Sequence, residues 1–177
     1  ELAIFGGYEA VASYEKMGFY ATDPAPGVYS ITQESTLDSI RSFKKENPDA
    51  FIVIFPHWGE NYGMKDGGQE SWAHSFVEAG ADLVLGHGAH LFQEVERYED
   101  KWILYGLGNF VFKAPGRYQK LDAEPYSVVA RLVLSEKDLK LRLYPIFSDN
   151  LVTDYETRFV TEEEFKDLSK RDDLKNL

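Results

Sequence analysis

The middle of the chain alternates between continuous apolar runs and an amphipathic stretch. Residues 51–55 and, after Asp82, the rest of residues 82–85 are apolar, which is typical of strands covered on both faces of a parallel sheet. Between them, residues 69–79 carry apolar side chains at helical spacing, and Gly80 is placed to end that helix in a left-handed turn. The pattern therefore predicts a parallel strand–helix–strand unit.

The segments before this unit predict a strand, a loop and a helix. Residues 2–8 are mostly apolar and predict a strand, whereas residues 23–27 contain two prolines and a glycine and predict a loop. A helix is expected to begin at Ser35 or Thr36, either of which can cap it. Its apolar face, which should cover the sheet, carries Leu37, Ile40 and Phe43.

In the second half of the chain, apolar residues alternate with other residues. Such alternation is typical of antiparallel strands with one buried and one solvated face. The predicted hairpins pair residues 92–98 with 102–105 around a turn at 99–100, and 128–134 with 139–143 around a turn at 135–138.

Thr161 and Glu164 have the spacing of a capping box, which predicts the start of a terminal helix. The tail of residues 171–177 is expected to be frayed. A chain of 177 residues suits one domain, residues 1–177, and buries roughly 70% of its unfolded surface. The predicted fold class is α/β with α+β character, a parallel βαβ unit followed by antiparallel hairpins.

Composition narrows the classes of partner. A formal net charge of −11 argues against nucleic acid and against anionic membrane surfaces, because both are bound through lysine and arginine. The chain has no cysteine, so histidine and carboxylate are the candidate metal ligands. No apolar run approaches the ~20 residues that span a bilayer. We therefore expect a soluble chain without a transmembrane segment. Both the bacterial cytoplasm and the cell envelope remain open as its compartment.

Three of the four histidines follow the two predicted parallel strands. His57 lies just past residues 51–55, and His87 and His90 lie just past residues 82–85. A strand–helix–strand crossover is right-handed, so both segments should emerge at the same edge of the sheet, where open α/β sheets bind ligands. The placement predicts half of a metal site. Manganese, zinc and iron all remain candidates, because imidazole binds each of them.

Other polar and aromatic residues have ordinary structural interpretations. His74, inside the predicted helix, is expected to be partly buried and hydrogen-bonded. Trp58 is expected in the core rather than against a substrate. Glu94 and Glu96 indicate a solvated strand face rather than an acid–base pair. No helix follows the Gly-Leu-Gly-Asn segment at 106–109, which favours a tight turn over a phosphate-binding loop.

The chain carries several motifs in a set order: Pro-His-Trp-Gly-Glu at 56–60, a helix opened by Gln69, Ala-Gly-Ala-Asp-Leu-Val-Leu-Gly-His-Gly-Ala-His at 79–90, and Gly-Leu-Gly-Asn-Phe-Val-Phe at 106–112. Together these motifs resemble the CapA family of poly-γ-glutamate capsule synthesis proteins. That family resembles calcineurin-like metallophosphoesterases, whose fold is a β-sandwich flanked by helices with a two-metal site at the strand ends. The resemblance implies that this chain is the C-terminal portion of such a sandwich.

Carried over position by position, the resemblance makes His57, His87 and His90 ligands of a divalent metal. It also makes Glu60 and Asn109 candidate catalytic residues. The family more often has its carboxylate four residues after the first histidine, whereas Glu60 lies three after His57. Glu60 is therefore also a candidate for supporting a ligand without binding the metal itself.

Calcineurin-like enzymes take their other ligands from the N-terminal half of the domain, and none of those motifs precedes His57. The resemblance therefore implies an incomplete metal site, with the missing N-terminal half as the partner of this chain. Two functions remain open. The parent is a metal-dependent hydrolase of phosphoester or γ-glutamyl amide bonds, with this piece inactive alone, or it is a non-catalytic subunit that binds poly-γ-glutamate or capsule-synthesis proteins.

Overall fold

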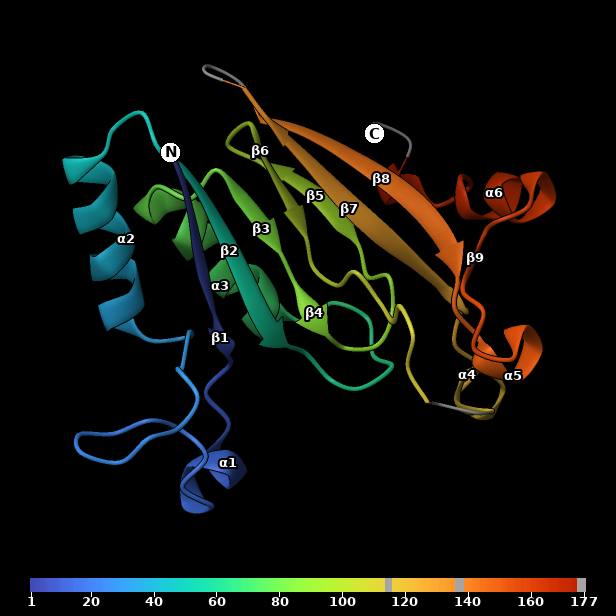
Figure 1. Ribbon diagram of the computed structural model, residues 1–177, viewed down its shortest axis with the longest axis horizontal. Coiled ribbons are helices and arrows are strands. Elements are labelled where there is room, and N and C mark those ends of the chain that lie inside the picture. The colour runs from blue at the N-terminus through green and yellow to red at the C-terminus, as the bar shows by residue number, and fades with distance from the viewer. Residues whose placement is uncertain (114–115, 136–138, 175–177) are drawn as a thin grey trace.

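The computed structural model describes residues 1–113, 116–135 and 139–174, and these form two sheets and several helices (Figure 1). The first sheet contains β1 (Leu2–Tyr8), β2 (Phe51–Trp58), β3 (Leu83–Leu85), β4 (His87–Gly88), β5 (Val95–Tyr98) and β6 (Lys101–Leu104). The second contains β7 (Tyr126–Leu134), β8 (Leu139–Phe147) and β9 (Arg158–Phe159). The helices are α1 (Ala12–Lys16), α2 (Glu34–Glu46), α3 (Gly67–Ala79), α4 (Arg117–Lys120), α5 (Asn150–Thr153), α6 (Glu162–Leu168) and the 3₁₀ helix η1 (Asp172–Leu174).

The predicted parallel unit is confirmed. Strand β2 pairs in parallel with β1 on one side and with β3 on the other, and α3 connects β2 to β3. Helix α3 begins with a capping box between Asp66 and Gln69, and it ends at Gly80, whose φ of 117° is left-handed. Both strands therefore end at the same edge of the sheet.

Helix α2 forms as predicted but begins earlier than its sequence suggests. Its first residue is Glu34, and the preceding Gln33 makes no side-chain capping hydrogen bond, so the predicted cap at Ser35 or Thr36 is wrong. Thr36 is instead buried, with its hydroxyl oxygen 2.8 Å from that of Tyr29. That tertiary contact uses the hydroxyl that the local pattern had assigned to the helix end.

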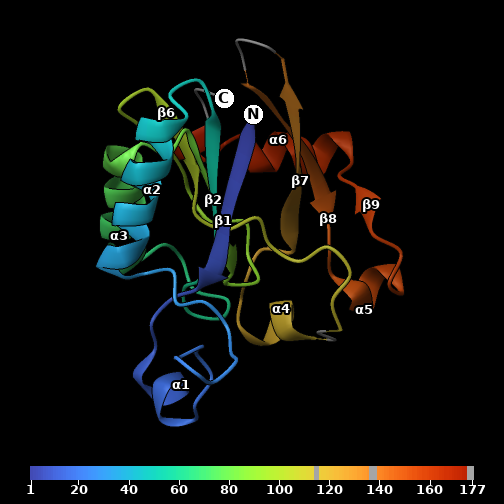
Figure 2. The ribbon, with the colours of Figure 1, turned by 60° about the vertical axis from the view of Figure 1, so that its left-hand side comes forward.

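The first sheet is covered on both faces (Figure 2). Helices α2 and α3 pack on one face, where Ile52, Ile54 and Phe76 are completely buried. The second sheet packs on the other face, where Val53 of β2 and Val128 of β7 share a buried cluster. The predicted sandwich of two sheets with flanking helices is therefore confirmed for this part of the domain.

Both predicted hairpins are present, although one belongs to the first sheet. Strands β5 and β6 pair antiparallel around Glu99 and Asp100, which both have positive φ, as a two-residue hairpin turn requires. Strand β6 also pairs in parallel with β3, so this hairpin extends the parallel sheet. Strands β7 and β8 form the second hairpin, and most of its predicted turn, 136–138, lies outside the described residues.

The end of the chain contacts the first sheet. Thr161 and Glu164 form the expected capping box of α6. The Arg171 guanidinium donates to the carbonyl of Phe92 at 2.8 Å and Asp173 accepts from the Val95 amide at 2.9 Å, while the frayed tail stays a prediction. Residues 175–177 lie outside the described part. Within that part, no helix combines the length and apolar character that crossing a bilayer requires.

Candidate functional site

His57 lies inside a strand rather than just past one, which corrects the sequence-based boundary. Strand β2 continues to Trp58 because it has partners on both sides at this point. Its His57 is paired with Tyr8 of β1 and with His87 of β4. Parallel pairing on both sides supplies the backbone hydrogen bonds that keep the chain extended beyond the apolar run. His57 still lies at the carboxyl end of β2, where the predicted site was expected.

His57 and His87 lie next to each other in the sheet with their rings edge to face. The ring centroids are 4.8 Å apart and the planes are 89° apart. Tyr8 stacks on His57 at 3.9 Å, and Phe55 contacts His87 at 4.3 Å. Gly88, at φ 111°, leaves room for this arrangement, because a Cβ there would lie 2.8 Å from Cδ2 of His57. The two imidazoles are therefore held by strand pairing and aromatic contacts.

Both of these histidines are held in the neutral form. Burial lowers the pKa of His57, and the positive charge that His90 would carry lowers it further. Burial, with a further contribution from His57, lowers the pKa of His87 to about 4. At neutral pH each ring therefore keeps a nitrogen lone pair, which is the form that binds a metal.

His90 is held differently. Its Nδ1 lies 2.7 Å from Oδ1 of Asn109, and its ring stacks on Tyr62 with centroids 5.3 Å apart. Phe112 also contacts the ring, at 4.5 Å. The backbone of His90 has a φ of 63°, a left-handed conformation that is uncommon outside glycine. The surrounding contacts hold this strained residue in place, a pattern that clusters at functional sites.

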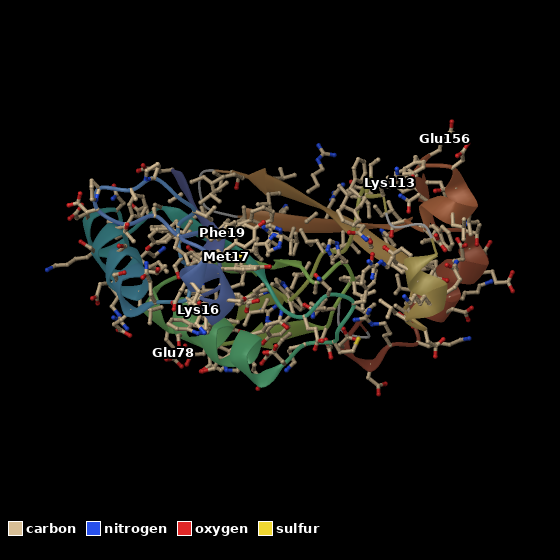
Figure 3. The ribbon with its side chains drawn as sticks, turned by 90° about the horizontal axis from the view of Figure 1, so that it is seen from below. Lys16, Met17, Phe19, Glu78, Lys113 and Glu156 are labelled. Carbon is tan, nitrogen blue, oxygen red and sulfur yellow. The ribbon has the colours of Figure 1, made fainter. Side chains whose placement is uncertain are left out.

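These residues line one pocket of about 360 Å³ at the carboxyl edge of the first sheet. Figure 3 looks towards this end of the molecule, with Lys16 and Met17 at the end of α1 on one side and Lys113 towards the other. All three histidines therefore lie at the predicted edge and Asn109 joins them, while their role as metal ligands stays a prediction. The lining residues are His57, His87, Gly88, His90, Gly108, Asn109, Phe110, Val111 and Phe112.

The pocket fits a metal only in part. Three imidazoles are suitable ligands for zinc, iron or manganese. In the described part of the chain, however, no three histidine, aspartate or glutamate side chains are grouped closely enough to hold one ion. Glu60 is exposed and does not line the pocket. The described residues therefore offer imidazole ligands without a complete ligand set, and the catalytic role of Glu60 stays a prediction.

Glu9 is an acidic residue near this edge that the sequence analysis missed. It follows β1, and its backbone amide donates to the carbonyl of His57 at 3.0 Å. Its carboxylate accepts from the Gly59 amide at 3.0 Å, and burial raises its pKa. The strand predicted at residues 2–8 was the available signal, because the residue after a third parallel strand lies at the same edge as His57.

The structural interpretations of the other residues are mostly confirmed. Trp58 is 1% exposed, and its Nε1 donates to the Tyr105 carbonyl at 2.7 Å, so it belongs to the core. His74 is partly buried, with Nε2 2.9 Å from Oε1 of Glu96. A solvated face is wrong for Glu96, because it also accepts a hydrogen bond from the Tyr105 hydroxyl.

The Gly-Leu-Gly-Asn segment is irregular, with Leu107 in an isolated bridge to Phe92, so the predicted tight turn is not observed there. Gly108 has a φ of 79°, and no helix begins until α4 in the described residues. Carbonyl and amide groups of the segment join the two sheets, since the Val128 amide donates to the Leu107 carbonyl at 2.9 Å. The segment therefore places Asn109 in the pocket while the backbone of Leu107 bonds to both sheets.

A mostly parallel sheet with a histidine pocket at its carboxyl edge, backed by a second sheet, is consistent with part of a metallophosphoesterase-like domain. Comparison with protein families gives the particular family. Residues 6–114, more than half of the chain, match the family described as bacterial capsule synthesis protein PGA_cap. The chain belongs to this family.

Curated relatives carry names from the same area of biology. The chain is 40% identical over 99 residues to the capsule biosynthesis protein CapA of Bacillus anthracis, covering 54% of this chain and 24% of that protein. It is 35% identical over 96 residues to the PGA biosynthesis protein CapA of Bacillus subtilis, covering 54% and 25%. A probable polyglutamine synthesis accessory protein of Mycobacterium tuberculosis is 32% identical over 129 residues, covering 68% and 34%. The matches thus span a quarter to a third of these relatives.

Proposed function

We propose that this chain is the histidine-bearing part of a protein that acts in the synthesis of a poly-γ-glutamate capsule. We also propose that its pocket supplies imidazole ligands to a divalent metal. The observation that carries the proposal is the convergence of His57, His87 and His90 on one pocket at the carboxyl edge of a parallel sheet. Family membership and the names of the relatives support the capsule role.

The reaction class that suits this arrangement is metal-dependent hydrolysis of a phosphoester or a γ-glutamyl amide. A bound divalent ion would polarise the substrate and supply a nucleophile at neutral pH. The residues of this chain hold neutral imidazoles at fixed positions, and Asn109 fixes the orientation of His90. The remaining ligands, which are acidic in such sites, come in this proposal from another part of the whole protein. In this proposal the whole protein acts in the bacterial cytoplasm or in the cell envelope.

The first test measures metal uptake by the purified chain and by the whole protein. Each is dialysed against Mn²⁺, Zn²⁺ or Fe²⁺ and its metal content is determined by elemental analysis. We expect stoichiometric metal in the whole protein, weaker uptake by the chain alone, and loss of uptake in His57→Ala/His87→Ala. His74→Ala is the matched control, because it removes the fourth histidine, which lies away from the pocket. Unchanged metal content in the double variant would contradict the proposed site.

The second test separates the capsule role from metal binding. The whole protein and its His57→Ala/His87→Ala variant are expressed in a bacterium that lacks its own CapA protein, and surface poly-γ-glutamate is measured. We expect the wild type to restore the polymer and the variant to fail at equal expression. Restoration by the variant would show that the pocket is dispensable and that the protein acts as a binding subunit.

A further inference from the structure

A chain of buried hydrogen bonds leaves the histidine pocket and crosses to the second sheet. It begins at His90, whose Nδ1 lies 2.7 Å from Oδ1 of Asn109. Nδ2 of Asn109 donates to the Tyr118 hydroxyl oxygen at 2.9 Å. That hydroxyl lies 3.1 Å from Oγ of Ser148, which lies 2.9 Å from Oγ of Ser127. We refer to these five residues as the relay.

The members of the relay come from five separate segments. His90 follows β4, Asn109 follows β6, and Tyr118 is in α4. Ser127 is in β7 and Ser148 directly follows β8. Asn109, Tyr118, Ser127 and Ser148 are each at most 7% exposed. A buried polar group without a partner is destabilising, so these side chains depend on one another for their hydrogen bonds.

The hydrogen-bond directions follow from the chemistry of the groups. The only donor of the Asn109 side chain is its amide nitrogen, which is used on Tyr118, so Oδ1 must be the acceptor facing His90. Nδ1 of His90 therefore carries the proton. Because the Tyr118 hydroxyl accepts from Asn109, its own proton is free to be donated to Ser148. Ser148 in turn donates to the Pro125 carbonyl at 3.3 Å, so its own proton also has an acceptor.

These hydrogen-bond directions determine which ring nitrogen of His90 carries the lone pair. With the proton on Nδ1, the lone pair of the neutral ring is on Nε2. A side-chain amide can rotate by 180° and exchange its oxygen and nitrogen, which would reverse the preference of His90. The Tyr118 hydroxyl disfavours that rotation, because it would then have to donate to Oδ1, and Ser148 could keep its bond to Tyr118 only by turning its own proton away from the Pro125 carbonyl.

Close packing also holds the residues of the relay in place. Gly108 lies directly against Ser127, and a Cβ at this position would approach Ser127 Oγ to 2.3 Å. Tyr62 packs edge to face on Tyr118 at 5.5 Å while it stacks on His90. Tyr118, Ser127 and Ser148 also lie beyond residue 114, where the family match ends.

We infer that Tyr118 is a positioning residue, which acts through Asn109 to keep Nε2 of His90 unprotonated and available in the pocket. This inference rests on the proposed function for its purpose. The tautomer of His90 can nevertheless be measured without any metal. A network that only joined the two sheets would affect stability and leave the tautomer unchanged.

The test is long-range ¹H–¹⁵N NMR of the metal-free chain with ¹⁵N-labelled histidine, at about pH 8 where free imidazole is neutral. The wild type is expected to show His90 protonated at Nδ1. In Tyr118→Phe, the ratio of the Nδ1–H form to the Nε2–H form is expected to fall about fivefold. This factor corresponds to the loss of one neutral hydrogen bond. Tyr105→Phe is the matched control, because Tyr105 is also fully buried and its hydroxyl is bonded to Glu96 away from the pocket.

A rescue variant separates positioning from packing. In Tyr118→Phe/Asn109→Asp, both carboxylate oxygens accept, so the Nδ1–H form of His90 is expected to return although Tyr118 is still absent. Ser148→Ala keeps Tyr118 and removes the acceptor of its proton, together with the contacts of Ser148 to Ser127 and Pro125, and it is expected to shift the tautomer in the same direction by a smaller factor. It provides the measurement if Tyr118→Phe does not fold.

Three results would overturn the inference. They are an Nε2–H form in the wild type, an unchanged tautomer in the folded Tyr118→Phe or Ser148→Ala variant, and an equal shift in Tyr105→Phe. The proposed metal site fails separately, if the whole protein binds no metal while the tautomer behaves as expected. The two failures are therefore distinguishable.

Discussion

The two walls of the histidine pocket are built in different ways. The strand wall, His57 and His87, is held by parallel backbone pairing and by ring contacts with Tyr8 and Phe55. The loop wall, His90 and Asn109, is held by a side-chain hydrogen bond. Within the described residues, no hydrogen bond reaches the ring nitrogens of the strand wall. The strand wall therefore fixes where its rings lie, whereas the loop wall also fixes which nitrogen is free.

This difference implies different weaknesses. A wall held by strand pairing is sensitive to anything that separates the strands, because the backbone there is packed against the core. A wall held by one side-chain hydrogen bond is sensitive to the loss of a single polar atom. The variants of Gly86, Asn109 and His87 below each perturb one wall.

The largest expected effect is that of Gly86→Ala, just before the strand wall. A Cβ at this position would lie 2.0 Å from the Tyr105 carbonyl oxygen and 2.3 Å from Trp58 Nε1, so it would break the hydrogen bond between them. Overpacking and the loss of a buried hydrogen bond together should lower the free energy of unfolding by about 3 kcal/mol or more. Urea denaturation measures this change.

Gly67→Ala is the matched control for that substitution. Gly67 begins α3, and a Cβ added there would meet no neighbouring atom within 4 Å, so alanine should be neutral or slightly stabilising at this position. Equal stability of the two variants would show that the packing between Gly86, Trp58 and Tyr105 does not support the strand wall.

A smaller effect is expected from Asn109→Ala on the loop wall. The substitution leaves the buried Tyr118 hydroxyl without its donor and His90 without its acceptor. The free energy of unfolding should fall by about 1–3 kcal/mol. Asn61→Ala is the control, because Asn61 is exposed and should change stability by less than about 0.5 kcal/mol. A loss in Asn61→Ala as large as in Asn109→Ala would refute the role given to the loop wall.

The strand wall was more predictable from the sequence than the loop wall. The apolar runs and the right-handed crossover were enough to bring His57 and His87 to one edge, because both depend on local patterns and on one general rule of topology. The end of β2 was misplaced because it depends on pairing with β1 and β4, which no local pattern reveals. The same limit explains why Glu9 was missed.

The loop wall depends on contacts between residues that are far apart in the sequence. Asn109 was singled out by a motif, but Tyr118 and Ser148 are an ordinary tyrosine and serine in their local context. The contacts of Arg171 and Glu96 were missed for the same reason, since their partners lie across the fold. Patterns report burial and periodicity well, and they do not report which polar atoms meet.

A pH titration should distinguish the walls further. The pKa of His87 is about 4 in the folded chain and about 6.5 when unfolded, so the unfolded state binds more protons between these values. The contribution of His87 to the free energy of unfolding is therefore complete above about pH 6.5, and it should decline as the pH falls towards 4. We expect a slope of up to about 1 kcal/mol per pH unit.

The measurement is urea denaturation between pH 7 and pH 5, above the range in which most carboxylates titrate. His87→Gln removes the titrating group and should flatten the dependence, leaving only the part that comes from the lowered pKa of His57. Parallel curves for the wild type and the variant would show that burial of His87 does not disfavour its protonated form.

The smallest effect is expected from Glu60→Gln, which tests whether a third, acidic wall exists in this chain. Glu60 is exposed and lies outside the pocket lining, so the substitution should change stability by less than about 0.5 kcal/mol. Metal uptake by the chain should also stay within about twofold, because ligand support typically accounts for a 10- to 100-fold change in affinity. A tenfold loss of Mn²⁺ or Zn²⁺ affinity in Glu60→Gln, with stability unchanged, would mean that this carboxylate reaches the pocket when metal is present. The two histidine walls would then be completed from within the chain, and the whole protein would not be needed for its acidic ligands.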